Sequence, residues 1–300
     1  GSGQLEHLYY GRKLHANEAV MTEKHTFIPG NTNVYNKDYS SYSLEDVCLE
    51  MSSLGKGDIR EPFIEVTYPN GSSTTDMVFD RAEIIQGKEE YDTLPGSYDD
   101  NGEVEQLVIY LKDRNYNLTL ELHYYVYEKC DIITRSAKLV NSGNESVRLE
   151  RLMSMQLDLN ESDYELSFFN GAWAREMNRS RIPIRAGKYV NESVTGTSSN
   201  RANPFFMIGR SSTTEDYGEC YGFNLIYSGN HYEAAQVNSY GKLRLVSGIN
   251  PATFSYIIEA GKCFEAPEAV LTYSYKGYNR MSHNMHEFVR KHIVRGSWRD

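Results

Sequence analysis

The sequence predicts an all-β protein, a large many-stranded antiparallel β-sandwich or supersandwich, followed by one C-terminal amphipathic helix. Three observations indicate this class. Apolar and polar residues alternate with the period of two that a half-buried strand shows. Turn-forming residues separate these stretches, and a helical period first appears after residue 280. With 300 residues, 40% of them hydrophobic, the chain is long enough to bury a large core.

The clearest strand covers residues 118–126, where Leu118, Leu120, Leu122, Tyr124 and Val126 alternate with more polar residues. Turn compositions at 112–116 and 141–144 flank successive strands, so residues 106–149 are expected to form an antiparallel meander. Further strands are predicted at residues 63–68, 77–85, 147–157, 221–228, 232–237, 243–248 and 269–274.

Two stretches, residues 29–57 and 178–204, have the composition of long loops. The second is dense in Asn, Ser, Arg and Gly. Long loops in a compact domain are usually functional or disordered, so both are expected to carry function or to lack regular structure.

The last stretch predicts a helix over residues 281–294 whose apolar stripe packs on a neighbouring surface. The stripe is formed by Met281, Met285, Phe288, Val289 and Ile293, which recur at steps of three and four. We therefore expect a sandwich domain at residues 1–278, and a helix and linker at residues 279–300.

Composition limits the classes of partner. The formal net charge is −10 and no basic cluster precedes the last helix, which disfavours nucleic acid and anionic membrane surfaces. No apolar run approaches the roughly 18 residues of a membrane span, and no targeting leader is apparent. Four cysteines lie far apart and form no Cys-x-x-Cys pair, so free thiols in a reducing cytoplasm are expected.

Polar motifs taken alone predict no cofactor and no metal. His283 and His286 have metal-compatible spacing, but only Glu287 accompanies them, so surface histidines are the preferred interpretation. No serine nucleophile elbow or phosphate-binding glycine loop is present. The 24 tyrosines suit a carbohydrate-binding face, but a broad amphipathic sheet explains them better.

Six motifs occur in an order that resembles one known family. They begin at residues 5, 55, 170, 195, 221 and 264 and read LEHLYYG, GKGDIREP, NGAWARE, TGTSSNRANPF, YGFNLIYSG and FEAPEAV. The chain resembles, over nearly its whole length, the N-terminal β-sandwich domain of bacterial α-galactosidases of glycoside hydrolase family 36.

That resemblance implies a (β/α)8 barrel after the sandwich, with the two catalytic aspartates of a retaining mechanism. Because a retaining glycosidase needs two carboxyl groups about 5 Å apart, a chain without the barrel is expected to be inactive. The implied partners are the enzyme's own barrel, other copies in a homo-oligomer, and α-galactosides such as raffinose. A sandwich without its barrel is also expected to expose an apolar patch. A self-standing carbohydrate-binding module and a pure assembly domain remain alternatives.

Three groups of residues are candidates for the substrate rim or a contact between subunits. Trp173 follows Gly171 at a predicted bend, and its indole suits the apolar face of a galactose. The alternative is a filler of the core or of a domain boundary. Arg175 beside it is expected to fix the loop. Asp58 and Arg60 form the second group. Arg60 is expected to be exposed and to bind a sugar hydroxyl or a loop of another subunit; the alternative is a surface salt bridge.

The third candidate is the stretch that contains Ser198, Ser199 and Asn200. Pro204 and the two phenylalanines after it indicate a loop that returns to the core. Its polar residues are then available for contacts, or else they order the loop through their own hydrogen bonds.

Overall fold

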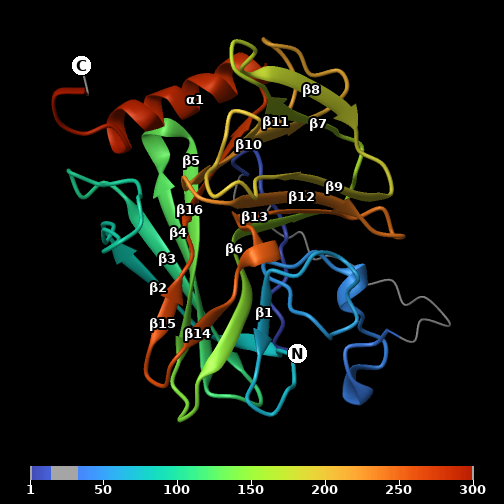
Figure 1. Cartoon of the computed structure of the whole chain (residues 1–300). Coiled ribbons are helices and arrows are strands. Elements are labelled where there is room, and N and C mark those ends of the chain that lie inside the picture. Colours follow the sequence, from blue (N-terminus) through green and yellow to red (C-terminus); the bar gives the residue numbers. More distant parts are fainter. Residues whose placement is uncertain (1, 15–32, 299–300) are drawn as a thin grey trace.

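The computed structural model describes residues 2–14 and 33–298, in which two antiparallel sheets pack face to face (Figure 1). The larger sheet has ten strands. Their order is β2 (Met77–Gln86), β3 (Glu105–Asp113), β4 (Leu118–Tyr127), β5 (Ile132–Asn141), β16 (Glu268–Ser274), β11 (Cys220–Ile226), β10 (Ala202–Gly209), β7 (Glu165–Asn170) and β8 (Asn178–Pro183), with β15 (Cys263–Glu265) also paired to β5.

The smaller sheet has six strands. Their order is β1 (Ile64–Thr67), β6 (Val147–Leu159), β13 (Leu243–Ile249), β12 (His231–Val237) and β9 (Gly187–Glu192), with β14 (Tyr256–Ile258) also paired to β6. Short 3-10 turns lie at η1 (Lys37–Tyr39), η2 (Leu44–Asp46), η3 (Glu128–Cys130), η4 (Pro251–Thr253) and η5 (Gly296–Trp298). The prediction of an all-β sandwich is confirmed.

The space between the sheets is filled by two apolar clusters. One contains Phe63, Leu120 and Val246, and the other contains Phe223 and Leu245. All five side chains are buried. Burying a side chain of this size contributes roughly 1.5–3 kcal/mol, so these clusters are the main stabilising contribution. The strand β6 passes through both of them.

All the predicted strands are present, but the prediction of a second long loop is wrong. Residues 178–204 contain β8, β9 and the start of β10. β8 and β9 are edge strands, and every one of their residues is exposed or half-buried. With no buried face, such strands need no apolar alternation, so their composition is that of a loop. The described part of the first predicted loop, residues 33–57, has irregular structure apart from η1 and η2.

The buried side of β4 changes along the strand, which the alternation did not predict. Leu120 and Leu122 face the smaller sheet, whereas Tyr125 and Tyr127 are buried on the opposite face. Val126, predicted to lie on the buried face, is 38% exposed. The cause is tertiary: at this end of β4 the outer face is covered by a helix and a loop, while the smaller sheet does not reach the inner face.

That helix is α1 (Gly277–His292), which starts four residues before the predicted boundary. Met281 and Phe288 are buried against β11, β16 and the end of β4, so the predicted packing of the apolar stripe is confirmed. His283 and His286 lie on its exposed face, and the placement of Val289 in the packed stripe is wrong, because its side chain is 43% exposed.

The loop is residues 88–98, which we call the strap. It is fixed to the sheet by Ser97, whose N–H and Oγ both donate to Glu268, and by Lys88, 3.5 Å from the same carboxylate. It is fixed to the helix by Tyr98, whose N–H donates to the carbonyl of His292 and whose hydroxyl donates to that of Val294. The strap therefore holds the C-terminal end of α1 against the sheet.

All four cysteines are free, as predicted; Cys48, Cys130 and Cys220 are buried and Cys263 is exposed. Within residues 2–14 and 33–298, no helix has the length and apolar character required to cross a membrane. Over the same residues, no three side chains of the His, Cys, Asp and Glu types gather as a metal site would require.

Candidate functional site: the hairpin tip that carries Trp173

The strands β7 and β8 form an antiparallel hairpin whose last pair is Asn170 with Asn178. The seven residues between them, 171–177, form a tip at one end of the larger sheet. Trp173 in this tip is 90% exposed and Met177 is 55% exposed. Trp173 therefore does not fill the core described here. Two interpretations of its role remain: a platform for a ligand, and a contact with another domain or subunit.

The backbone of the tip is closed on itself. Ala172 and Arg175 exchange backbone hydrogen bonds of 3.2 and 2.9 Å, and the Glu176 carboxylate accepts from the N–H of Ala174 at 2.9 Å. Ala174 and Met177 have φ values of 59° and 54°. This left-handed conformation costs a non-glycine residue roughly 1–2 kcal/mol, so the closing hydrogen bonds offset a real strain.

Gly171 explains how the tip meets the second candidate loop. A Cβ at Gly171 would lie 2.8 Å from the carbonyl oxygens of Arg175 and Asn200 and from the Cα of Glu176. Asn170 also donates from Nδ2 to the carbonyl of Arg201 at 3.0 Å. The sequence therefore requires glycine here because two backbones touch.

The structure thus brings together Trp173, Arg175, Ser198, Ser199 and Asn200. Arg175 and Asn200 are exposed, and Ser198 and Ser199 are half-buried. The N–H of Ser198 donates to the carbonyl of Ser228 at 2.8 Å, and the Ser199 hydroxyl accepts from the N–H of Arg201 at 3.1 Å. The serines order their own loop, while the tryptophan, the arginine and the amide face solvent.

Asp58 and Arg60 lie elsewhere, and the expectation of an exposed Arg60 is wrong. Their side chains are 2% and 0% exposed and belong to a cluster with Asp158 and Arg244, which we call the buried quartet. Arg60 lies 2.9 Å from Asp58 and 3.2 Å from Asp158. Arg244 lies 2.9 and 2.7 Å from the same two carboxylates. Two cations and two anions make the cluster neutral.

The quartet fastens irregular chain to the smaller sheet. Arg60 donates from Nη2 to the carbonyls of Leu44 and Val47, and Asp158 on β6 accepts from the N–H of Leu49 at 2.9 Å. Burial alone would raise the pKa of Asp58, but the guanidinium groups of Arg244 and Arg60 outweigh it and hold the pKa below its ordinary value. The quartet is a structural anchor for residues 44–60.

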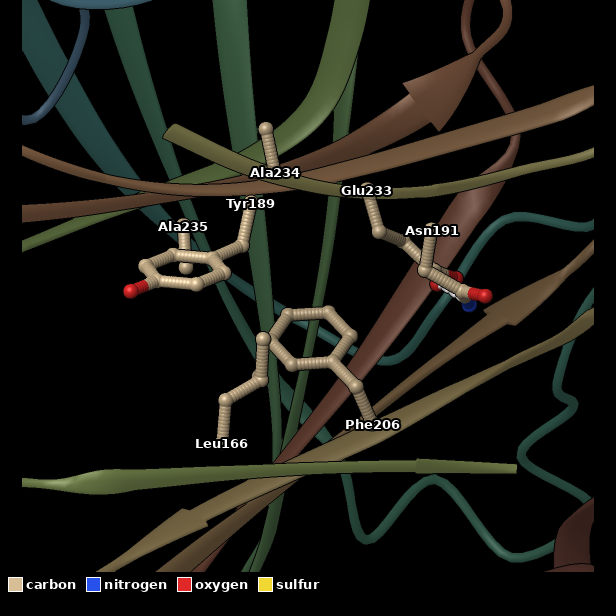
Figure 2. Close-up of a pocket in the computed structure, with 7 residues that line it drawn as sticks. All are labelled: Leu166, Tyr189, Asn191, Phe206, Glu233, Ala234 and Ala235. Carbon is tan, nitrogen blue, oxygen red and sulfur yellow. Dashed lines mark hydrogen bonds between the residues drawn. The ribbon is translucent and has the colours of Figure 1, made fainter. Parts of the chain in front are cut away.

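Figure 2 shows a small cavity between β9 and β12 of the smaller sheet and β7 and β10 of the larger one. Its lining is mostly apolar: Tyr189 of the smaller sheet lies opposite Leu166 and Phe206 of the larger one. The carboxyl group of Glu233 accepts from Nδ2 of Asn191 at 2.6 Å. The volume, about 10 Å³, suits a single water molecule and excludes a sugar.

Glu233 is buried without a cation. Burial raises the pKa of its carboxyl group well above the ordinary value, and burial lowers the pKa of His231, whose Nδ1 lies 3.6 Å from the carboxyl. Both shifts favour the uncharged forms of the two groups over an ion pair. Asn191 also donates to the carbonyl of Asn203 at 2.7 Å, and Asn203 donates to the Met177 sulfur, so this interior connects to the tip.

Sequence reasoning missed the residues that support both regions. Gly171 was noted only as a bend, and Met177 and Asn203 were not identified. Asp158 and Arg244 were missed: Asp158 lies one residue beyond the predicted strand 147–157, and Arg244 is the second residue of the predicted strand 243–248. A charged residue with a leucine on each side at the end of a predicted strand, as both are, is the signal for such a buried ion pair.

Comparison with known proteins gives one consistent result. The family model described as the glycosyl hydrolase family 36 N-terminal domain matches residues 3–259. The α-galactosidase AgaA of Geobacillus stearothermophilus is 36% identical over the whole chain, and the bifunctional α-galactosidase/sucrose kinase AgaSK of Mediterraneibacter gnavus is 34% identical over 99% of it. The chain covers 41% and 32% of these relatives.

Solved structures agree. A crystal structure of Geobacillus AgaA in complex with stachyose superposes with a TM-score of 0.95 at 35% identity, over 100% of this chain and 42% of that one. Because the family match spans most of the chain and the identities exceed 30%, the chain belongs to the N-terminal domain family of glycosyl hydrolase family 36.

Proposed function

We propose that the chain is the non-catalytic N-terminal domain of a retaining α-galactosidase that hydrolyses terminal α-galactosides such as the raffinose family. The observation that carries the proposal is the extent of the matches. The whole of this chain aligns with α-galactosidases, but it covers only about two fifths of their length. In this proposal the sandwich occupies residues 1–278, and residues 279–300 lead towards a (β/α)8 barrel that contains both catalytic aspartates. The whole enzyme acts in the cytoplasm as a homo-oligomer.

The hairpin tip is the proposed contribution of this domain to the substrate rim or to a contact between subunits. Trp173 offers an exposed indole on a rigid base, and Arg175, Ser198, Ser199 and Asn200 surround it with polar groups. Aromatic side chains on pre-organised supports are typical of binding hot spots. Asp58 and Arg60 serve this function only indirectly, because they hold residues 44–60 in place.

A carbohydrate-binding module is the second candidate, favoured by the 90% exposure of Trp173. A titration of the chain with raffinose, read by isothermal calorimetry, separates the two functions. Saturable binding at millimolar or tighter affinity that is lost in Trp173→Ala supports the module. No binding supports the accessory domain, in which the site needs the barrel to be complete.

Catalysis is tested directly. The purified chain should release no chromophore from a chromogenic α-galactoside above an enzyme-free blank, because in this proposal both carboxyl groups of the retaining site belong to the barrel. Turnover that disappears when a carboxylate of this chain is substituted would place the active site within the sandwich and refute the proposal.

A further inference from the structure

One apolar area on the larger sheet has no partner among the described residues. Cross-strand pairs place Ile84 of β2 beside Leu107 of β3, and Val126 of β4 beside Ile133 of β5. Leu107 pairs with Tyr124, two positions from Val126 on the same face of β4. Directly opposite side chains on one face lie about 5 Å apart and diagonal neighbours about 7–8 Å. Ile84 with Leu107 and Val126 with Ile133 therefore form two apolar pairs that meet diagonally between Leu107 and Val126, and the exposed Glu105 lies opposite Val126.

We call it the inner-face patch, because it lies on the side of the sheet that faces the smaller sheet. Leu122 continues the same face of β4 and is buried in the core cluster that both sheets share. Beyond Tyr124 the smaller sheet ends. Ile84 is 78% exposed, Val126 is 38% exposed, and Leu107 and Ile133 are half-buried.

The opposite face of the same strands shows that this exposure is not general. There Gln106, Val108, Tyr125 and Tyr127 are each 5% exposed or less, beneath the strap and α1. The outer face is therefore covered over β3 and β4, whereas Ile85 on the same face of β2 is 42% exposed. A contiguous apolar surface left open on a folded domain marks a contact with another protein segment.

The position of the end of α1 indicates which segment. Arg295 lies 2.9 Å from Glu90 in the strap, and Glu90 follows the last residue of β2 by four positions. Four residues span at most about 14 Å. Figure 1 shows the end of α1 and the strap on the β2 side of the molecule. A polypeptide that continues from α1 therefore starts beside the edge strand that carries Ile84.

We propose that the inner-face patch is the docking surface for the part of the enzyme that follows α1. This inference rests on the proposed function, since AgaA has about three fifths of its length outside the match. A tethered partner that starts near the β2 edge of the same sheet has a high effective concentration there, so a modest apolar area is enough to hold it. Contact with the inner-face patch would hold the rest of the enzyme beside β2, the edge strand of the larger sheet.

A hybrid enzyme tests the proposal, with this chain in place of the matching N-terminal part of Geobacillus AgaA. Ile84→Asp is compared with Ile257→Asp, a control on β14 at an exposed position (58%) outside the patch. In the separate 300-residue chain both variants should melt within about 1 °C of the parent chain, because both side chains are exposed. In the hybrid, Ile84→Asp should lower the melting temperature by at least about 5 °C more than the control.

The outcomes are distinguishable. An active hybrid in which both variants melt alike overturns the docking surface and leaves the proposed function standing. An unsubstituted hybrid with a folded sandwich but no α-galactosidase activity overturns the proposed function. Sedimentation of the separate chain adds a third test: a dimer that Ile84→Asp dissociates assigns the patch to a second copy and overturns the inference.

Discussion

The buried quartet and the hairpin tip both arise from short, glycine-containing motifs, yet the fold uses them in opposite ways. Arg60 is fully buried and neutralised, whereas Trp173 is almost fully exposed. The difference comes from residues far away in sequence. Asp158 and Arg244 complete the quartet from two central strands, while the tip has neighbours only at its base. A motif therefore specifies chemistry, and the partners that the fold supplies determine whether it stabilises or binds.

The largest effect is expected from breaking the quartet. Arg244→Met keeps much of the side-chain volume but leaves Asp58 and Asp158 buried beside a single guanidinium. Removing one partner of a buried ion pair costs about 3–5 kcal/mol, because the remaining charge loses its compensation. Equilibrium unfolding in urea measures the loss.

The matched control is Lys129→Met, which breaks an ion pair with Glu103 whose side chains are 71% and 45% exposed. Such a pair contributes less than about 1 kcal/mol. Equal losses of unfolding free energy in the two variants would show that the quartet is not an anchor.

Glu233 sharpens the comparison, since it is buried without the cations that the quartet has. Its raised pKa means that the folded state holds the carboxyl proton to a higher pH than the unfolded state does. The stability that the protonated carboxyl contributes is complete below the unfolded pKa, near 4.5, and declines as the pH rises towards the folded pKa. Glu233→Gln, which is neutral and similar in shape, should therefore stabilise the chain at pH 7 by about 1–3 kcal/mol.

Urea unfolding of both proteins between pH 4 and pH 8 checks this. The difference in unfolding free energy should be small at pH 4 and increase with pH. His231 is present in both proteins, so its own titration makes a similar contribution to each. A difference that is constant over this range would mean that Glu233 is charged in the folded state.

The contact between the two loops is tested by Gly171→Ala. The added methyl group meets backbone atoms of Arg175, Asn200 and Glu176 at 2.8 Å, and backbone cannot move as a flexible side chain does. Overpacking of this kind costs about 1–3 kcal/mol. Hydrogen exchange should become faster in residues 171–177 and 198–201 and remain unchanged in β6. Gly187→Ala, at a glycine with open space around it but φ of +117°, separates backbone strain from this clash.

The sequence predicts this fold better than this site, for a physical reason. Strands with a buried face, such as β4 and β6, must alternate, so their pattern identified them. β8 and β9 bury neither face, and their loop-like composition concealed them. The helix was predicted because Met281 and Phe288 must both reach the sheet. The exposure of Trp173 and the burial of Arg60 depend on contacts more than 20 residues distant, which no local pattern encodes.

The smallest effect on stability is expected at the most prominent residue. Trp173→Ala removes a side chain that is 90% exposed, so the unfolding free energy of the separate chain should change by less than about 0.5 kcal/mol. In the hybrid with the rest of AgaA the same substitution should raise the KM for raffinose or weaken subunit association, because truncating an aromatic hot spot costs about 2 kcal/mol or more. A loss of stability in the separate chain would mean that the indole supports the hairpin. If neither KM nor association changed in the hybrid, Trp173 would contact neither substrate nor another subunit, despite the strained backbone at Ala174 and Met177 that presents it. The proposed rim would then have to lie elsewhere.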